Sequence, residues 1–260
     1  MLILDQKEYY QKIKNLNIEH YTGEIPYYTQ APIRKVEQAV LLKLKQGVDL
    51  LDLGCGSGRF SIGAAQIGFN NVVGVDITPW AVNAAIKKAE RLRVENVSFL
   101  VGDMTNLPFQ DKTFDYVFCP RFSINAVATF SQRKRAIEEM LRVVKDDGNV
   151  FIESFNKLYL GNGFMFKNIA RDIGIYFVMF YFWLKNKKYN GLLPGDLIYK
   201  ANKVETASEG YAHLPTIFEL LRLMPKGIEF KFYSIPQINK EKETDLLKFF
   251  RYSIWIFIKK

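Results

Sequence analysis

Cysteine is scarce in this chain, since Cys55 and Cys119 are the only two among 260 residues. Two thiols cannot build a disulfide scaffold, and they are too few for a four-cysteine zinc or iron–sulfur site. Such usage is typical of a reducing compartment. The sequence therefore predicts a cytoplasmic protein without a metal centre.

Long apolar runs are also lacking. The N-terminal stretch MLILDQKEYY turns polar after four residues, too early for the core of a signal peptide. The longest uncharged apolar run, residues 173–184, falls short of the roughly 18 to 20 residues that span a bilayer. We therefore expect no membrane span. The run could be helical packing, a dimer face, a wall for a hydrophobic substrate or a peripheral membrane contact, and the oligomeric state stays open.

Acidic residues are outnumbered, with 27 Asp and Glu against 36 Lys and Arg, for a net charge of +9. The excess is uneven: residues 1–150 have a net charge of +2 and residues 151–260 a net charge of +7. A basic surface attracts anionic partners such as RNA, a phosphorylated metabolite or lipid headgroups. It can equally serve solubility alone.

Strand-like and helix-like segments alternate between residues 48 and 154. Buried-strand patterns occupy 48–53, 71–76, 97–101, 114–119 and 149–153, and helix patterns occupy 59–67, the segment from 79 onward and about 131–144. This spacing implies parallel strands with right-handed crossovers. With two terminal strands, 228–234 and 251–258, the predicted fold class is α/β, a doubly wound, mostly parallel seven-stranded sheet.

Two segments interrupt this alternation. Residues 1–46 are aromatic and helix-prone, and we expect them to form an N-terminal helical cap. Residues 157–226 follow the fifth strand and are expected to be an insertion that acts as a substrate lid. The predicted core is then 47–156 together with 227–260.

Two helix boundaries are expected inside these segments. Pro32 could open a helix that stops at Gly47. Thr216 and Glu219 have the spacing of a capping box, which predicts a helix start near Pro215.

The strongest chemical signal is the segment 52–58, DLGCGSG, between the first strand and its helix. Its three glycines leave the backbone open to a ligand, and the helix start behind them offers unpaired N–H groups. A dinucleotide fingerprint needs another glycine where Arg59 stands. The carboxylate of Asp52 would also repel a pyrophosphate but suits a cation, which disfavours a nicotinamide oxidoreductase.

Further candidates follow the next two strands. Asp76 ends the second strand, where a carboxylate can accept both hydroxyls of a ribose. Asp103 follows the third strand and could accept from the exocyclic amine of a base, while Met104 offers a backbone donor and apolar packing. Trp80 could cover an adenine. Each also has a structural interpretation, as a turn cap, a surface ion pair or ordinary packing.

Together these segments resemble the class I S-adenosylmethionine-dependent methyltransferases. VDLLDLGCGSGRF is similar to their first motif, VVGVDIT to their second, and VGDMTNLPFQDKTFDYVFC to their third with the fourth strand. The resemblance covers about residues 33–156 and 227–260. It implies a Rossmann-like methyltransferase fold, S-adenosyl-L-methionine as the cofactor and S-adenosyl-L-homocysteine as the product.

The resemblance also implies roles for single residues. Asp52 would lie near the methionine ammonium, Asp76 would bind the ribose, and Asp103 with Met104 would bind the adenine. The full set of cofactor-binding residues that it implies is Asp52, Gly54, Cys55, Gly56, Gly58, Asp76, Ile77, Trp80, Asp103, Met104 and Pro120.

Catalysis in such a family is an in-line attack of a substrate nucleophile on a sulfonium methyl, so the protein mainly orients the two partners. A base is needed only if the nucleophile is protonated at neutral pH. Two catalytic candidates follow. Arg121 comes after the fourth strand and could bind an acidic substrate or form a surface salt bridge. His213, one of two histidines, could be a base or a structural residue.

We expect a methyltransferase that acts on an oxygen or nitrogen of a small-molecule acceptor, because the family's insertions at this place often form a closed lid. One alternative is a tRNA-type RNA methyltransferase, prompted by the basic C-terminal part and by GDLIYKANKV, which faintly resembles wobble-uridine tRNA methyltransferases. Another alternative is a non-catalytic S-adenosylmethionine-binding regulatory protein.

Overall fold

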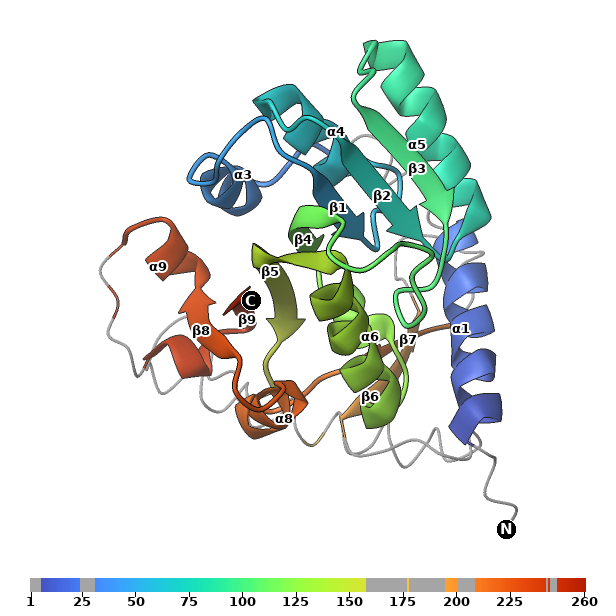
Figure 1. The fold of residues 1–260 in the computed structure, drawn as a ribbon. Coiled ribbons are helices and arrows are strands. Elements are labelled where there is room, and N and C mark those ends of the chain that lie inside the picture. The colour runs from blue at the N-terminus through green and yellow to red at the C-terminus, as the bar shows by residue number, and fades with distance from the viewer. Residues whose placement is uncertain are drawn as a thin grey trace.

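The structure is a computed structural model of the chain and describes residues 6–23, 31–157, 177, 195–200, 209–241, 243 and 247–260. Within these ranges a seven-stranded sheet forms the centre, in the order β3-β2-β1-β4-β5-β9-β8 (Figure 1). The strands are β1 (Leu50–Leu53), β2 (Val72–Asp76), β3 (Val97–Val101), β4 (Phe114–Cys119), β5 (Val144–Phe155), β8 (Glu229–Ser234) and β9 (Ser253–Lys259).

The first five strands are parallel, whereas β9 is antiparallel to both of its neighbours. All four residues of β1 are buried, as expected for a parallel strand that is covered on both faces. The predicted fold class is therefore confirmed, a Rossmann-like mixed sheet that is mostly parallel.

Helices cover both faces of this sheet (Figure 1). They are α3 (Lys35–Leu41), α4 (Arg59–Ile67), α5 (Pro79–Leu92), α6 (Phe130–Val143) and α8 (Ile217–Leu223), with the short helices η1 (Ser123–Ala126), α9 (Ile235–Ile238) and η2 (Leu247–Phe250). Leu50 and Phe118 pack with α3 and α4, while their sequence neighbours Leu51 and Val117 pack with α6 and α8 on the other face. This alternation follows from the two-residue period of a strand.

Two predicted boundaries are wrong. The helix expected from Pro32 to Gly47 is only α3, Lys35–Leu41. The fifth strand begins at Val144 instead of residue 149, because the chain stays extended beside β4 through a register irregularity. This close approach of the two strands requires glycine at position 148, because a Cβ there would lie 2.5 Å from the carbonyl oxygen of Asp115.

The start of α8 is as predicted, with the Thr216 hydroxyl accepting a hydrogen bond from the Glu219 backbone N–H at 3.2 Å. The Glu219 carboxylate, however, makes its bonds with the side chains of His213 and Arg133. The capping-box spacing therefore predicts the helix start correctly. The Glu219 side chain, however, bonds to residues outside the helix instead of to the N-cap backbone.

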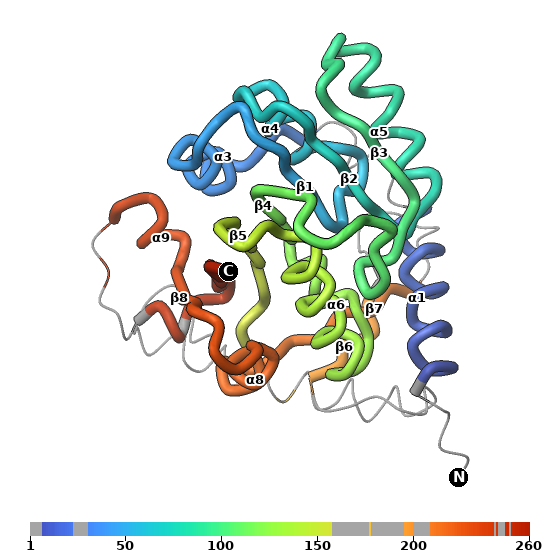
Figure 2. Tube along the Cα trace, in the orientation of Figure 1, coloured from blue at the N-terminus to red at the C-terminus, as the bar shows by residue number. Residues whose placement is uncertain are grey.

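Helix α1 (Gln6–Gly23) and the hairpin of β6 (Asp196–Lys200) with β7 (Glu209–His213) lie together beside the sheet (Figure 2). Their contact is buried, and Asn17 bridges it: its amide nitrogen donates to the carbonyl of Ala126 at 3.0 Å, and its oxygen accepts from the Tyr211 N–H at 2.8 Å. An N-terminal helix thus holds part of the insertion against the core.

The apolar run 173–184 lies outside the described residues, apart from Phe177. Among the helices that the structure does describe, none combines the length and apolar character needed to cross a bilayer.

Candidate functional site

A cavity of about 490 Å³ opens at the carboxyl ends of the central strands. Ligands of open α/β sheets bind at this edge, where the strand order reverses on either side of β1. Every cofactor-binding residue expected from the sequence lines it, except Gly58. Those that line it are Asp52, Gly54, Cys55, Gly56, Asp76, Ile77, Trp80, Asp103, Met104 and Pro120.

The glycine turn after β1 forms one wall. The N–H groups of Gly54 and Cys55 both donate to the carbonyl of Val75, at 2.8 and 3.1 Å, which ties the turn to β2. Gly54 has φ +74°, and a Cβ there would lie 2.3 Å from Ser123 Oγ. Gly58 caps α4 with φ +76°, and a Cβ on it would reach to within 2.8 Å of Phe99. Glycine is therefore required at both places.

Asp52 places a buried carboxylate behind this turn. Its Oδ2 accepts from the Ser61 hydroxyl at 2.5 Å, while its Oδ1 has no hydrogen-bond partner among the described residues. Burial raises the pKa of Asp52 to about 7, although the Ser61 hydrogen bond and the charge of Arg59 oppose this. An unpartnered buried carboxylate oxygen is costly unless a donor or cation meets it.

Asp76 stands at the end of β2 with both oxygens engaged by backbone donors. Oδ2 accepts from the Gly56 N–H and Oδ1 from the Thr78 N–H, each at 2.9 Å. Burial raises the pKa of Asp76, and these hydrogen bonds offset part of that rise. The carboxylate is thus fixed in direction and retains lone pairs for further donors.

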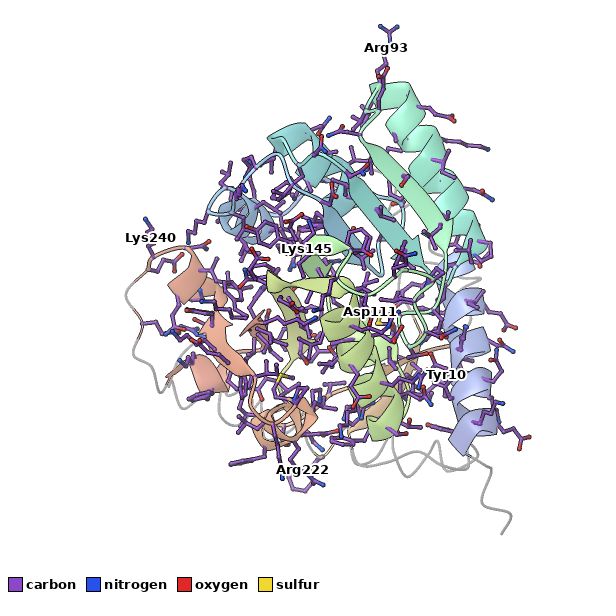
Figure 3. The ribbon with its side chains drawn as sticks, viewed as in Figure 1. Tyr10, Arg93, Asp111, Lys145, Arg222 and Lys240 are labelled. Atoms are coloured by element: carbon purple, nitrogen blue, oxygen red, sulfur yellow. The ribbon has the colours of Figure 1, made fainter. Side chains whose placement is uncertain are left out.

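Asp103 is bound more fully than the sequence suggested. Its carboxylate accepts from the Lys14 ammonium at 2.7 Å, the Tyr10 hydroxyl at 2.9 Å, and the backbone and side chain of Thr105 at 2.9 and 2.8 Å. In Figure 3, Tyr10 lies on the side of α1 that faces the body of the molecule. Burial alone would raise the pKa of Asp103, but Lys14 and Thr105 lower it. An adenine amine would have to displace one of these donors.

Trp80 and Cys55 also line the cavity. The indole Nε1 of Trp80 is buried without a partner in the described part of the chain. Burial raises the pKa of the Cys55 thiol well above its usual value, so this thiol stays protonated and is no nucleophile.

The two catalytic candidates lie in different surroundings. Arg121 lines the cavity just after β4, with an exposed side chain and a left-handed backbone of φ +53°. His213 is buried and is not among the lining residues. Its Nδ1 is 2.7 Å from Asp196 Oδ1 and its Nε2 is 2.7 Å from Glu219 Oε1. Because both ring nitrogens are already bonded to carboxylates, this geometry argues against His213 as the base and assigns it a structural role.

Several residues that line the cavity were not predicted from the sequence. Arg59 lines the cavity and forms an ion pair with the buried Glu37. Phe122, Phe155 and Tyr252 form an aromatic group beside Arg121. Phe122 follows β4, Phe155 ends β5 and Tyr252 precedes β9, all at the ligand-binding edge, so the predicted topology could have indicated them. Nothing in the sequence indicated the contact between Lys14 and Asp103.

Comparison with known proteins agrees with this arrangement, since the sequence family described as "Methyltransferase domain" matches residues 44–174. The chain belongs to that family. The solved CcbJ methyltransferase of Streptomyces caelestis has the same fold, with a TM-score of 0.65, 11% identity, and coverage of 94% of this chain and 97% of that one.

Two curated relatives share more of the sequence over a shorter length. The human EEF1A lysine methyltransferase 2 is 30% identical over 144 residues, covering 52% of this chain and 59% of the relative. A demethylmenaquinone methyltransferase of Bacillus cereus is 34% identical over 112 residues, covering 42% and 46%. The chain thus spans about half the length of these relatives.

Proposed function

We propose that the protein transfers a methyl group from S-adenosylmethionine to an oxygen or nitrogen of a small molecule. The observation that carries this proposal is Asp52. Its unpartnered, buried Oδ1 lies in the wall of a cavity beside a bare glycine turn. This acceptor oxygen and the open glycine backbone fit a ligand that has a cationic ammonium and approaches the backbone closely, as S-adenosylmethionine does.

The residues present can hold each part of this cosubstrate. Asp52 would pair with the ammonium, Asp76 with the ribose hydroxyls, and Trp80 and Met104 would pack on the adenine. The bound group supplies a methyl carbon on a good leaving group. The chain's own task is then the orientation of the two reactants.

The acceptor's lone pair forms the new bond to the methyl carbon while the carbon–sulfur bond breaks, and the acceptor's proton leaves to water. Among the described lining residues, the three carboxylates all come from the ends of β1, β2 and β3. No dedicated base is therefore assigned on the acceptor side. An acceptor that is unprotonated or weakly acidic at neutral pH fits such a site.

The named relatives act on different acceptors: a lysine methyltransferase for EEF1A and a methyltransferase for demethylmenaquinone. The small-molecule assignment for this chain is supported by the cavity, which α1 and the hairpin partly enclose. A flat RNA or protein surface would reach such a cavity only through a protruding nucleotide or side chain.

The test is transfer of radiolabelled methyl from S-adenosylmethionine into a fractionated cell extract. Label in the small-molecule fraction is expected, and it should disappear with Asp76→Ala. Label only in RNA or protein would overturn the acceptor class. Tight binding of S-adenosylhomocysteine with no transfer to any fraction would favour the non-catalytic alternative instead.

A further inference from the structure

The cavity has a second wall, which the cosubstrate assignment does not use. Phe122, Phe155 and Tyr252 line it next to the end of β4. The rings of Phe122 and Phe155 stack with centroids 3.8 Å apart and planes 15° apart, and Tyr252 packs on both, with ring centroids at 5.7 and 5.1 Å. Aromatic faces and edges of this kind bind flat rings well.

The backbone at this wall is strained. Arg121 and Phe122 are consecutive non-glycine residues in the left-handed region, with φ +53° and +63°. Such conformations persist only where the surrounding structure holds them, and they cluster at ligand sites. The strain presents the Phe122 ring to the cavity beside Phe155.

Glu153 holds this arrangement together. Its carboxylate is fully buried on β5, two residues before Phe155 and on the same face of the strand. Oε2 accepts from the Arg121 N–H at 2.8 Å, next to Phe122, and Oε1 accepts from the Ser253 hydroxyl at 2.7 Å, next to Tyr252. One carboxylate thus fixes the two chain segments that carry the outer rings.

Arg34 neutralises this buried charge. Its guanidinium forms an ion pair with Glu153, and it also bonds Glu37, which in turn pairs with Arg59 in the cavity wall. Glu153 therefore accepts a hydrogen bond on each oxygen while it stays buried and out of contact with the methyl acceptor.

Charge decides which kind of ring would fit. The lining carboxylates lie on the β1–β3 side, whereas the charged side chain beside the aromatic wall is Arg121. A cationic acceptor would meet the Arg121 charge, while the nearby Glu153 carboxylate is buried and already paired with Arg34. A neutral ring would stack on the wall at no electrostatic cost.

Resting on the proposed function, we propose that Phe122, Phe155 and Tyr252 form the acceptor subsite for a flat, uncharged ring, and that Glu153 is its positioning residue. The ring carries the nucleophilic hydroxyl or ring nitrogen. Glu153 acts through Arg121 and Ser253 and does not touch the acceptor.

The test measures binding of 1-naphthol, and of cyclohexylamine as the cationic comparison, by equilibrium dialysis in saturating S-adenosylhomocysteine. The wild-type protein is expected to bind 1-naphthol at least tenfold more tightly than cyclohexylamine. Phe122→Leu and Phe155→Leu should weaken naphthol binding at least fivefold and change S-adenosylhomocysteine affinity less than twofold. Phe218→Leu, at an exposed ring of α8 outside the cavity, is the matched control and should change neither.

Glu153→Gln should weaken naphthol binding as strongly as Phe122→Leu while S-adenosylhomocysteine affinity stays within twofold. A residue with a structural role alone would lower both affinities or neither. Because Glu153→Gln removes a buried charge and could fail to fold, Ser253→Ala provides a milder second variant with the same expected direction. An unchanged naphthol affinity in Ser253→Ala and in any folded Glu153→Gln would overturn the positioning role.

Naphthol binding no tighter than that of cyclohexylamine, or binding that Phe122→Leu leaves intact, would overturn the subsite. These failures are distinct from failure of the proposed function. If S-adenosylhomocysteine does not bind but naphthol binding without it still depends on Phe122, the cosubstrate assignment falls and the subsite stands.

Discussion

Gly54 shows how one atom decides the shape of the glycine turn. An added Cβ would lie 2.3 Å from Ser123 Oγ, and the backbone has φ +74°. Gly47 has nearly the same φ, +72°, but nothing within 4 Å of its Cβ position. The two positions share the backbone strain and differ only in the clash, which makes Gly47 the matched control.

We predict that Gly54→Ala lowers the free energy of unfolding by about 3 kcal/mol and Gly47→Ala by about 1 kcal/mol. Urea denaturation of both variants measures the difference. Equal losses would mean that Ser123 moves away freely and that the turn is not tightly packed.

Asp52 predicts a pH dependence of ligand binding. Its pKa is raised to about 7, and only the ionised carboxylate pairs with an ammonium. Affinity for S-adenosylhomocysteine should therefore rise about tenfold between pH 6 and pH 8, following the ionised fraction. Calorimetric titrations across this range should show the rise in wild type, while Asp52→Asn should bind weakly with a flat profile. A rise of the same size in Asp52→Asn would assign the titration to another group.

At the scale of elements, α1 is held to the segment just after β3 by the contacts of Lys14 and Tyr10 with Asp103. The Lys14 ion pair is partly buried, so it should contribute more than an exposed pair. We predict that Lys14→Ala lowers hydrogen-exchange protection of α1 severalfold. Gln11→Ala, whose side chain bonds Asn15 on the exposed face of the same helix, should not. Equal protection in both variants would show that apolar packing alone holds α1.

The hairpin of β6 and β7 is fastened by His213, which lies between the carboxylates of Asp196 and Glu219. Burial alone would raise the pKa of Glu219, but His213 and Arg133 lower it below its usual value. Removing the imidazole would leave the carboxylates of Asp196 and Glu219 on either side of an empty space of the size of the ring.

We therefore predict that His213→Ala lowers the free energy of unfolding by about 3 kcal/mol while S-adenosylhomocysteine affinity remains within a fewfold of wild type. Thermal unfolding and calorimetry separate the two effects. Normal stability together with abolished methyl transfer would restore His213 as the base.

At the scale of the whole molecule, part of the basic charge lies on outward-pointing side chains. Arg93, Arg222 and Lys240 project away from the body in Figure 3. We predict that methyl transfer to a small acceptor changes less than twofold between 50 and 200 mM salt, because no phosphate backbone is bound. An RNA acceptor would lose binding by orders of magnitude over that range. Initial rates in labelled extract at the two salt concentrations provide the measurement.

Much of the fold could be predicted from short stretches of the sequence. The strands and the glycine turn could be predicted because each depends on neighbouring residues: an apolar run such as LLDL at 50–53, then glycines. The contacts between distant segments that enclose the site could not be predicted in this way. Lys14 and Asp103 are 89 residues apart, and neither charge indicates the other. The surroundings of His213 could not be predicted for the same reason, since Asp196 and Glu219 lie 17 and 6 residues away in the chain and meet its ring only in the folded protein.

The most direct measurement is a calorimetric titration of the wild-type protein with S-adenosylhomocysteine, beside a parallel titration with a nicotinamide dinucleotide. The cavity predicts saturable one-site binding of S-adenosylhomocysteine at micromolar affinity or better, and no heat of binding from the dinucleotide. A silent titration with S-adenosylhomocysteine, or saturable binding of the dinucleotide in its place, would contradict the account.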